Sequence, residues 1–190
     1  WTWKEPKSKS FRTFNKERAE EISDVLRNQS LEVTSVTSKE KKSFAPGLYD
    51  LTTLQREANR KYGYSAKQTL NIMQRLYENH KVLTYPRTDS RYIGKDIVPT
   101  IKERLRACAT GPYRKPAGAL MNQPVRANGS FVDDKKVSDH HAIIPTEQFV
   151  QLQHMTVEER KIYDLVVRRF LAVLLPAAEY DETVITAEIG

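Results

Sequence analysis

Residues 51–87 read LTTLQREANRKYGYSAKQTLNIMQRLYENHKVLTYPR, and this stretch carries most of the information about the fold. Thr52 and Ser65 are each followed three residues later by a glutamine, a pattern typical of a capped helix start. Gly63 lies between them, where a helix C-cap is expected. Apolar residues then recur at the spacing of a buried helical stripe, namely Leu70, Met73, Leu76 and Tyr77. We therefore predict two consecutive helices joined by a short turn.

A short strand at about residues 82–87 is expected after these helices, and the order helix, helix, strand resembles a winged helix-turn-helix. Before this part, residues 1–46 predict a strand, a helix and a second strand. The helix is capped by Asn15 and ends near Asn28, and the second strand covers residues 31–37. Residues 39–47, which include Pro46 and Gly47, predict a turn or boundary.

The C-terminal half begins with a predicted helix over residues 96–108. Six Gly and Pro residues in 109–137 then predict a long loop. Thr156 and Glu159 form a capping box for a helix that ends near Leu175, and residues 183–190 predict a strand that returns to the first module. The expected class is α+β, mainly α with short β. Residues 47–155 would form a winged-helix-like domain, and residues 1–46 and 156–190 would belong to a β-rich domain.

Composition excludes several classes of protein. Of the 190 residues, 39% are hydrophobic and 29% are charged, which indicates a folded protein with a large hydrated surface. The longest apolar run is residues 170–175, far below the about 20 residues of a membrane span. Cys108 is the single cysteine, so an internal disulfide framework is excluded and the cytosol is the expected compartment. The sequence begins without an initiator Met or a signal-peptide pattern and stops within the predicted last strand, which suggests a piece of a larger protein.

The positive charge is concentrated in the central third of the chain. The formal net charge is +7, and residues 51–110 alone contain 12 Lys and Arg against 5 Asp and Glu. A basic block of this kind is typical of a protein with a phosphate-rich partner, although many such blocks only aid solubility. A membrane surface is not expected as a partner, because no basic amphipathic helix has a clear aromatic face.

Tyr85 and Arg87 are the first pair with evident chemistry. A strand period of two would place both side chains on one face, and Pro86 between them favours an edge strand or a strand end. Tyrosine is a weak nucleophile at its ordinary pKa of about 10, so attack on a phosphodiester needs nearby positive charge. An arginine fork supplies that charge and binds phosphate oxygens, and Asp89 could orient it. Such a Tyr-x-Arg pattern also arises often by chance at a surface turn.

His140 and His141 are the second pair. Adjacent side chains on a strand diverge, so the two imidazoles are not expected to chelate one metal ion. One imidazole could donate a hydrogen bond to a phosphate, while a purely structural pair is the plainer interpretation. Basic residues around the two helices could follow a nucleic-acid backbone, although each is more often a solvated charge: Arg56, Arg60, Lys61, Lys67, Arg75, Lys81, Arg91, Lys102 and Arg106.

Four motifs in this order resemble the type IA DNA topoisomerases, nearest to the topoisomerase III branch. They are LTTLQ at residues 51–55, QRLYE at 74–78, LTYPRTDSR at 83–91 and HHAIIPT at 140–146. By this resemblance Tyr85 takes the 5′-phosphate of single-stranded DNA and releases a 3′-hydroxyl. Arg87 contacts the scissile phosphate and His140 lies near it. The supporting or DNA-binding residues would be Thr88, Asp89, Ser90, Arg91, His141, Lys67 and Arg75.

The resemblance also implies a cofactor and partners. Mg²⁺ would be bound by an acidic Toprim module that these residues do not include, so no metal site or cofactor is expected within the chain. Single-stranded DNA would be the partner of the chain, and a RecQ-like helicase and a single-strand binding protein those of the full bacterial, cytoplasmic enzyme. Residues 1–46 and the last strand would belong to an arch-like gate domain. The chain alone would bind DNA and not cleave it.

Three other interpretations compete with this one. A non-catalytic winged-helix module would prefer duplex DNA and would not depend on Tyr85. A tyrosine recombinase, by resemblance, would need a His-x-x-Arg element ahead of a late tyrosine, and no such element occurs. A purely structural or partner-binding segment would show no affinity for DNA.

Overall fold

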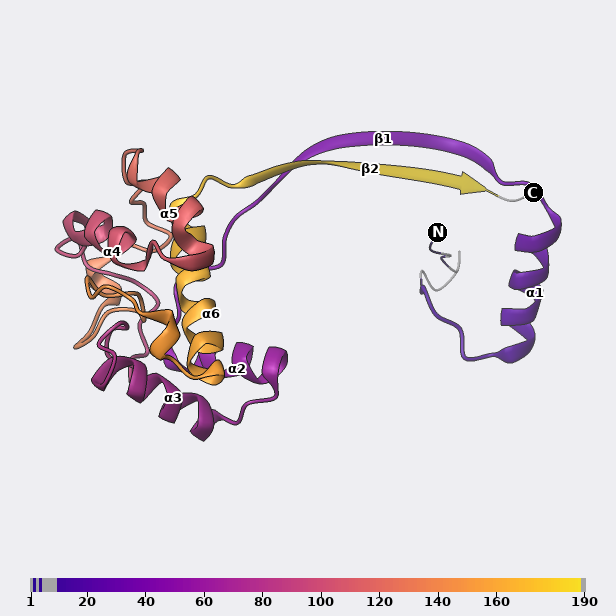
Figure 1. The fold of residues 1–190 in the computed structure, drawn as a ribbon. Coiled ribbons are helices and arrows are strands. Elements are labelled where there is room, and N and C mark those ends of the chain that lie inside the picture. The colour runs from indigo at the N-terminus through magenta and orange to yellow at the C-terminus, as the bar shows by residue number, and fades with distance from the viewer. Residues whose placement is uncertain (1, 3, 5–9, 189–190) are drawn as a thin grey trace. The chain divides into compact units, whose positions relative to one another are not determined.

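The computed structural model describes residues 2, 4 and 10–188, and the chain divides into two compact units (Figure 1). The first unit combines both ends of the chain, up to residue 42 and from residue 179. The second comprises residues 43–178. Described helices outnumber strands, and the single described sheet has two strands, so the expected α+β class is confirmed. No helix among the described residues is long and apolar enough to cross a membrane.

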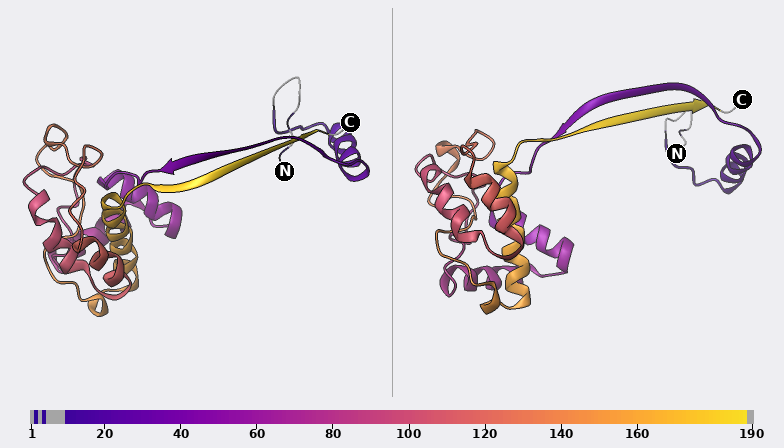
Figure 2. Two further views of the ribbon diagram at one scale, coloured as in Figure 1. Left: turned by 90° about the horizontal axis from the view of Figure 1, so that it is seen from above. Right: turned by 45° about the horizontal axis from the view of Figure 1, so that its top comes forward.

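The first unit contains helix α1 (Lys16–Asn28) and strands β1 (Glu32–Ser43) and β2 (Ala178–Glu188). Asn15 caps α1 as predicted, because its side chain accepts a hydrogen bond from the Arg18 N–H. The two strands form one antiparallel ribbon (Figures 1 and 2), so the last strand does return to the first module. The described residues before α1 form no strand, and the rest of that predicted strand lies outside the described residues.

Of the turn or boundary predicted at residues 39–47, the boundary is confirmed, because the two units divide after residue 42. Residues 39–42 form no turn, because β1 continues through them. Lys41 pairs with Glu182 at 2.6 Å and Lys42 pairs with Glu179 at 2.7 Å, both across the ribbon. Opposite charges facing each other on neighbouring strands favour pairing, and here the partners come from opposite ends of the sequence. The lysines that suggest a turn therefore belong to an extended strand.

The second unit is built around helix α6 (Val157–Leu174), which packs against α2 (Leu51–Tyr62), α3 (Ala66–Glu78) and α5 (Arg114–Met121) (Figure 2). A fourth helix, α4 (Ile101–Cys108), packs on α5. The predicted division at residue 155 differs from this packing, because α6 presents a row of buried apolar side chains to the second unit: Ile162, Tyr163, Val166, Val167 and Phe170.

Most of the predicted helix ends are confirmed. Ser65 caps α3, Gly63 ends α2 with a φ of 71°, and Thr156 and Glu159 form the capping box of α6. Thr52 is not a cap, because it lies within α2. The cap is Asp50, whose carboxylate accepts a hydrogen bond from the Thr53 N–H at 2.6 Å.

The predictions between residues 96 and 137 are confirmed only in part. The third helix starts as a 3₁₀ turn (Val98–Thr100) before α4, and residues 95–97 are not helical. The predicted long loop contains a 3₁₀ turn (Gly111–Tyr113) followed by α5. Two further 3₁₀ turns, Asp134–Lys136 and Leu152–His154, complete the described helical elements.

The predicted stripe of α3 and the predicted strand at residues 82–87 also differ. In α3 the buried apolar residues are Ile72, Met73 and Leu76, whereas Tyr77 is 37% exposed. Residues 82–87 form no regular strand: their pairing is reduced to an isolated antiparallel bridge between Leu83 and Pro145, and the chain bends at Pro86.

Candidate functional site

Two segments that pair antiparallel at an isolated bridge form the framework of the candidate site. We call residues 82–91 the tyrosine segment and residues 140–146 the histidine segment. Thr146 N–H donates to the Val82 carbonyl at 3.1 Å, and Thr84 N–H donates to the Ile144 carbonyl at 3.0 Å. The histidine segment places residues 142–144 in the core, which anchors both segments.

Tyr85 lies between two other rings. Its ring centroid is 4.3 Å from that of His140, with the planes tilted by 40°. Tyr77 of α3 meets it edge-on, with centroids 5.5 Å apart. Tyr85 is half-buried and His140 is exposed, so a ligand in solvent can reach both side chains.

Arg87 lies two residues beyond Tyr85 and is exposed. Within the described part of the chain its guanidinium has no ion pair or hydrogen bond, so its charge is available to an anion. The expected contact from Asp89 to Arg87 is not present. Asp89 is exposed, and its carboxylate accepts a hydrogen bond from Ser138 Oγ at 3.4 Å.

Thr88 and Ser90 point into the protein. Thr88 Oγ1 donates to the His140 carbonyl at 3.0 Å, and Ser90 Oγ donates to the Lys136 carbonyl at 2.7 Å. Both residues are buried, with 7% and 5% of their surface exposed. Their hydroxyls therefore hold loops together and are not directed at a ligand.

Arg91 and His141 also contact the backbone. Arg91 Nε donates to the Leu48 carbonyl at 3.2 Å, and His141 Nδ1 lies 2.9 Å from the Ala142 carbonyl. Of the two histidines, His140 is therefore the one whose ring adjoins Tyr85.

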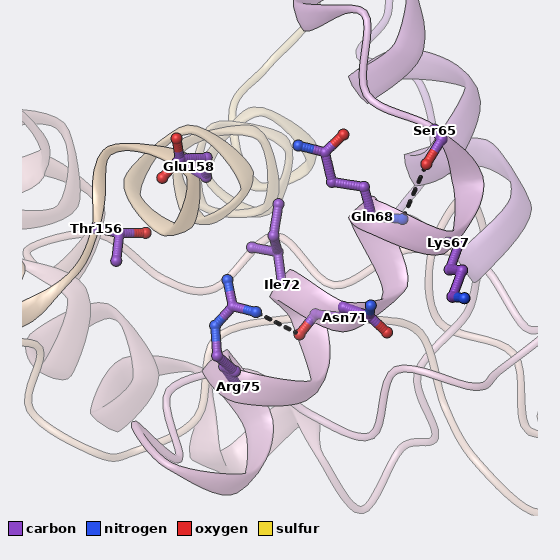
Figure 3. Close-up of a pocket in the computed structure, with 8 residues that line it drawn as sticks. All are labelled: Ser65, Lys67, Gln68, Asn71, Ile72, Arg75, Thr156 and Glu158. Atoms are coloured by element: carbon purple, nitrogen blue, oxygen red, sulfur yellow. Dashed lines mark hydrogen bonds between the residues drawn. The ribbon is translucent and has the colours of Figure 1, made fainter.

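Lys67 and Arg75 lie away from this framework, on α3. They line a polar hollow of about 430 Å³ between α3 and the start of α6 (Figure 3). Arg75 is not a free cation, because its Nε donates to Glu159 at 2.7 Å. Lys67 is exposed at the rim and remains available to a phosphate.

Two other groups bear on the chemistry. Burial raises the pKa of the Cys108 thiol to about 12, so this side chain is not a nucleophile near neutral pH. In the part of the chain that the structure describes, no group of three or more His, Cys, Asp or Glu side chains is placed to hold a metal ion.

Two residues of the site are not evident from the sequence. Helical spacing predicts a buried position for Tyr77 and does not show that its ring turns toward Tyr85. Nothing in the sequence singles out Thr84 alone. Thr84 and Thr88 do, however, lie two residues before and two residues after Pro86, and this symmetry could have drawn attention to the pair. The arrangement as a whole presents a phenol, an imidazole and a free guanidinium to solvent, which suits a reaction at a phosphate group.

Comparison with known proteins identifies the family of the chain. Residues 2–190 match the family described as DNA topoisomerase. The chain is 60% identical over 189 residues to DNA topoisomerase 3 of a Bacillus cereus strain, and 49% identical to that of Bacillus subtilis (strain 168). Each alignment covers 100% of this chain and 26% of the relative, so the chain spans about a quarter of their length.

A solved structure agrees as well. The fold is similar to full-length topoisomerase I from Thermotoga maritima, with a TM-score of 0.64 and 27% identity over 94% of this chain and 28% of that one. The chain therefore belongs to the type IA DNA topoisomerases, as a region like that of bacterial topoisomerase III.

Proposed function

We propose that Tyr85 is the nucleophile with which a type IA DNA topoisomerase cleaves single-stranded DNA. Its phenolic oxygen attacks a phosphodiester, forms a bond to the 5′-phosphate and releases a 3′-hydroxyl. A phosphotyrosine ester replaces the phosphodiester of the DNA backbone, so the free energy of the broken bond is conserved in the new one. The strand can therefore be resealed without ATP. Passage of another strand through the break then relaxes or decatenates DNA.

The observation that carries this proposal is the position of the Tyr85 ring, 4.3 Å from His140 in a half-exposed setting. A phenol with an ordinary pKa of about 10 needs positive charge beside the phosphate to react near neutral pH. Arg87 carries a permanent charge two residues away and is free to bind a phosphate oxygen. We assign Arg87 to the scissile phosphate and His140 to a hydrogen bond with that phosphate.

Mg²⁺, which the family implies, does not fit the described residues, because they offer no cluster of metal-ligating side chains. We therefore propose that the metal is held elsewhere in the enzyme and that this chain alone binds DNA without cleaving it.

We further propose roles for the two units. Residues 43–178 would be the tyrosine-bearing, winged-helix-like part, and the ribbon of β1 and β2 would belong to the arch-like gate. Lys67 would follow the DNA backbone. A RecQ-like helicase and a single-strand binding protein are proposed partners of the complete enzyme.

The test is covalent capture of DNA by the full-length protein. End-labelled single-stranded DNA with Mg²⁺ should give an SDS-resistant adduct, and Tyr85→Phe should abolish it. Tyr92→Phe is the matched control. Tyr92 is also a half-buried tyrosine near the histidine segment, but its hydroxyl lies 3.3 Å from Lys136 and its ring has no contact with Tyr85 among the described residues. An adduct that persists in Tyr85→Phe would exclude Tyr85 as the nucleophile and favour a non-catalytic DNA-binding module.

A further inference from the structure

Pro86 interrupts the hydrogen bonding between the tyrosine segment and the histidine segment. Backbone bonds join the two segments at Val82 and Thr84. Pro86 has no N–H to donate, so a regular ladder cannot continue through it. Among the described residues, no backbone hydrogen bond joins residues 86–91 to the histidine segment, and the next one runs from the Ala142 N–H to the Tyr92 carbonyl at 2.8 Å. The stretch of backbone next to Tyr85 therefore needs another connection to His140.

Two threonine hydroxyls supply that connection. Thr84 Oγ1 donates to the Ala142 carbonyl at 3.0 Å and accepts a hydrogen bond from the Ile144 N–H at 3.0 Å. Thr88 Oγ1 donates to the His140 carbonyl at 3.0 Å. A hydroxyl has one proton, so each threonine commits its proton to a carbonyl of the histidine segment.

Thr88 is fixed from both sides. Its hydroxyl accepts a hydrogen bond from the Ser90 N–H at 3.1 Å, and its carbonyl accepts one from the Leu51 N–H at 3.0 Å. With 7% of its surface exposed, it cannot turn toward a ligand without breaking these bonds. The His140 carbonyl is thus held by a residue that is itself bonded to the start of α2.

We propose that Thr84 and Thr88 are positioning residues that keep His140 against the Tyr85 ring, and we call the pair the threonine clasp. This inference rests on the proposed function of Tyr85, and it assigns to Thr88 a role other than contact with DNA. The clasp replaces the missing ladder around Pro86 and sets the distance between the nucleophile and its histidine. Misplacement of a reacting group by about 1 Å can slow a reaction by about a hundredfold.

The experiment measures adduct formation and DNA binding separately in the full-length protein. Single-turnover rates and Kd for a labelled single-stranded oligonucleotide are compared for Thr88→Val, Thr88→Ser, Thr84→Val and Thr84→Ser. Each valine variant should react about ten- to a hundredfold more slowly with Kd changed by less than about twofold. Each serine variant keeps the hydroxyl and should recover to within about threefold of the original rate.

Thr69→Val is the matched control. Thr69 is fully buried on α3 and its hydroxyl donates to the Ser65 carbonyl at 3.0 Å. Thr69→Val therefore removes the same group from the same unit, and among the described residues no hydrogen bond of Thr69 reaches either segment. Its adduct rate should stay unchanged. The clasp is overturned if the valine variants react at the original rate, if serine does not restore it, or if the loss lies wholly in Kd.

A second readout does not depend on catalysis. Because the Tyr85 ring lies 4.3 Å from that of His140, the imidazole proton resonances of His140 should be shifted by its ring current. Thr88→Val and Thr84→Val should move these resonances toward the values of a solvated histidine, and Thr69→Val should not. If the unmodified protein formed no adduct, the proposed function would fail, and these resonances would still decide whether the clasp positions His140. Unmoved resonances in both valine variants would contradict it.

Discussion

At the scale of single residues, Glu159 shows how one buried carboxylate ties two helices together. It accepts hydrogen bonds from Arg75 Nε at 2.7 Å and from the Thr156 N–H at 2.9 Å, and His80 Nε2 lies 3.3 Å away. Burial by itself raises the pKa of Glu159, but the hydrogen bonds from Arg75 and Thr156 outweigh it and hold that pKa below its ordinary value. The ionised form is therefore the one that stabilises the fold.

Glu159→Gln should lower the free energy of unfolding at pH 7 by about 1–3 kcal/mol, because it removes the negative charge that strengthens the hydrogen bond from Arg75 and leaves the guanidinium without its counter-charge. The pKa of Glu159 is lower in the folded state than in the unfolded state. Its contribution is therefore complete above the unfolded pKa and is lost as the pH falls through the folded pKa. Urea unfolding at a series of pH values should show the difference from the original protein shrinking toward acid.

Glu158→Gln is the control for this measurement. Glu158 is the exposed neighbour of Glu159 at the rim of the hollow in Figure 3, and the described residues give it no ion pair. An equal loss of stability in both variants, or a constant difference at every pH, would contradict the assignment.

At the scale of elements, helix ends follow local chemistry, whereas α5 depends on what surrounds it. Pro116 lies in the first turn of α5, where the absent N–H has no helical partner to lose. Ala117 and Leu120 are buried, and Tyr113 donates to Asp164 of α6 at 3.0 Å. Packing on α6 and α4 therefore makes a helix of a segment whose Gly and Pro content predicts a loop.

Two glycine-to-alanine substitutions should change the stability of the protein in opposite directions. Gly63→Ala forces a side chain into the left-handed conformation at φ 71° and should cost about 1 kcal/mol, although the added carbon meets nothing within 4 Å. Gly118→Ala, within α5, also meets nothing within 4 Å but has helical backbone, and should stabilise the protein by about 0.5–1 kcal/mol. Thermal or urea unfolding measures the stability of both variants. If both substitutions stabilised the protein, or both destabilised it, backbone conformation would not be what decides their effects.

At the scale of the whole molecule, charge is unevenly distributed along the chain. Residues 51–110 contain 12 Lys and Arg against 5 Asp and Glu, and the structure places all of them in the second unit. Several of these cations are already paired within the protein, such as Arg75 with Glu159 and Arg104 with Glu147. Fewer than the 12 Lys and Arg side chains of residues 51–110 are therefore available to a ligand. Arg87 and Lys67 are two of those that are.

Binding of single-stranded DNA should weaken steeply with salt, because each phosphate that a protein cation neutralises releases counterions. The logarithm of the association constant should fall linearly with the logarithm of salt concentration between about 50 and 300 mM, with a slope of about −0.7 per phosphate contacted. Fluorescence anisotropy measures this slope. Arg87→Gln should reduce its magnitude and Arg104→Gln should not, and a slope of zero would exclude backbone contacts.

The sequence by itself determined several local features of this protein, and four of the predicted helix caps are confirmed. Caps at Asn15, Ser65 and Thr156 and the C-cap at Gly63 depend on residues within one turn of each other, so short-range chemistry settles them. The motif around Tyr85 and its order relative to the histidines also predicted the family correctly. The roles proposed for Tyr85, Arg87 and His140 stay predictions until adduct formation is measured.

Only the tertiary structure decided which of these groups meet. The pairing of Lys41 with Glu182, the formation of α5, the burial of Thr88 and the placement of Tyr77 and His140 around Tyr85 each join residues that are distant in sequence or depend on packing against another element. Such contacts form only when segments distant in sequence are brought together by the tertiary fold, and no local sequence pattern specifies which segments meet. A free arginine and a paired one look alike in sequence, and they differ only once Glu159 lies beside Arg75 and no described carboxylate pairs with Arg87.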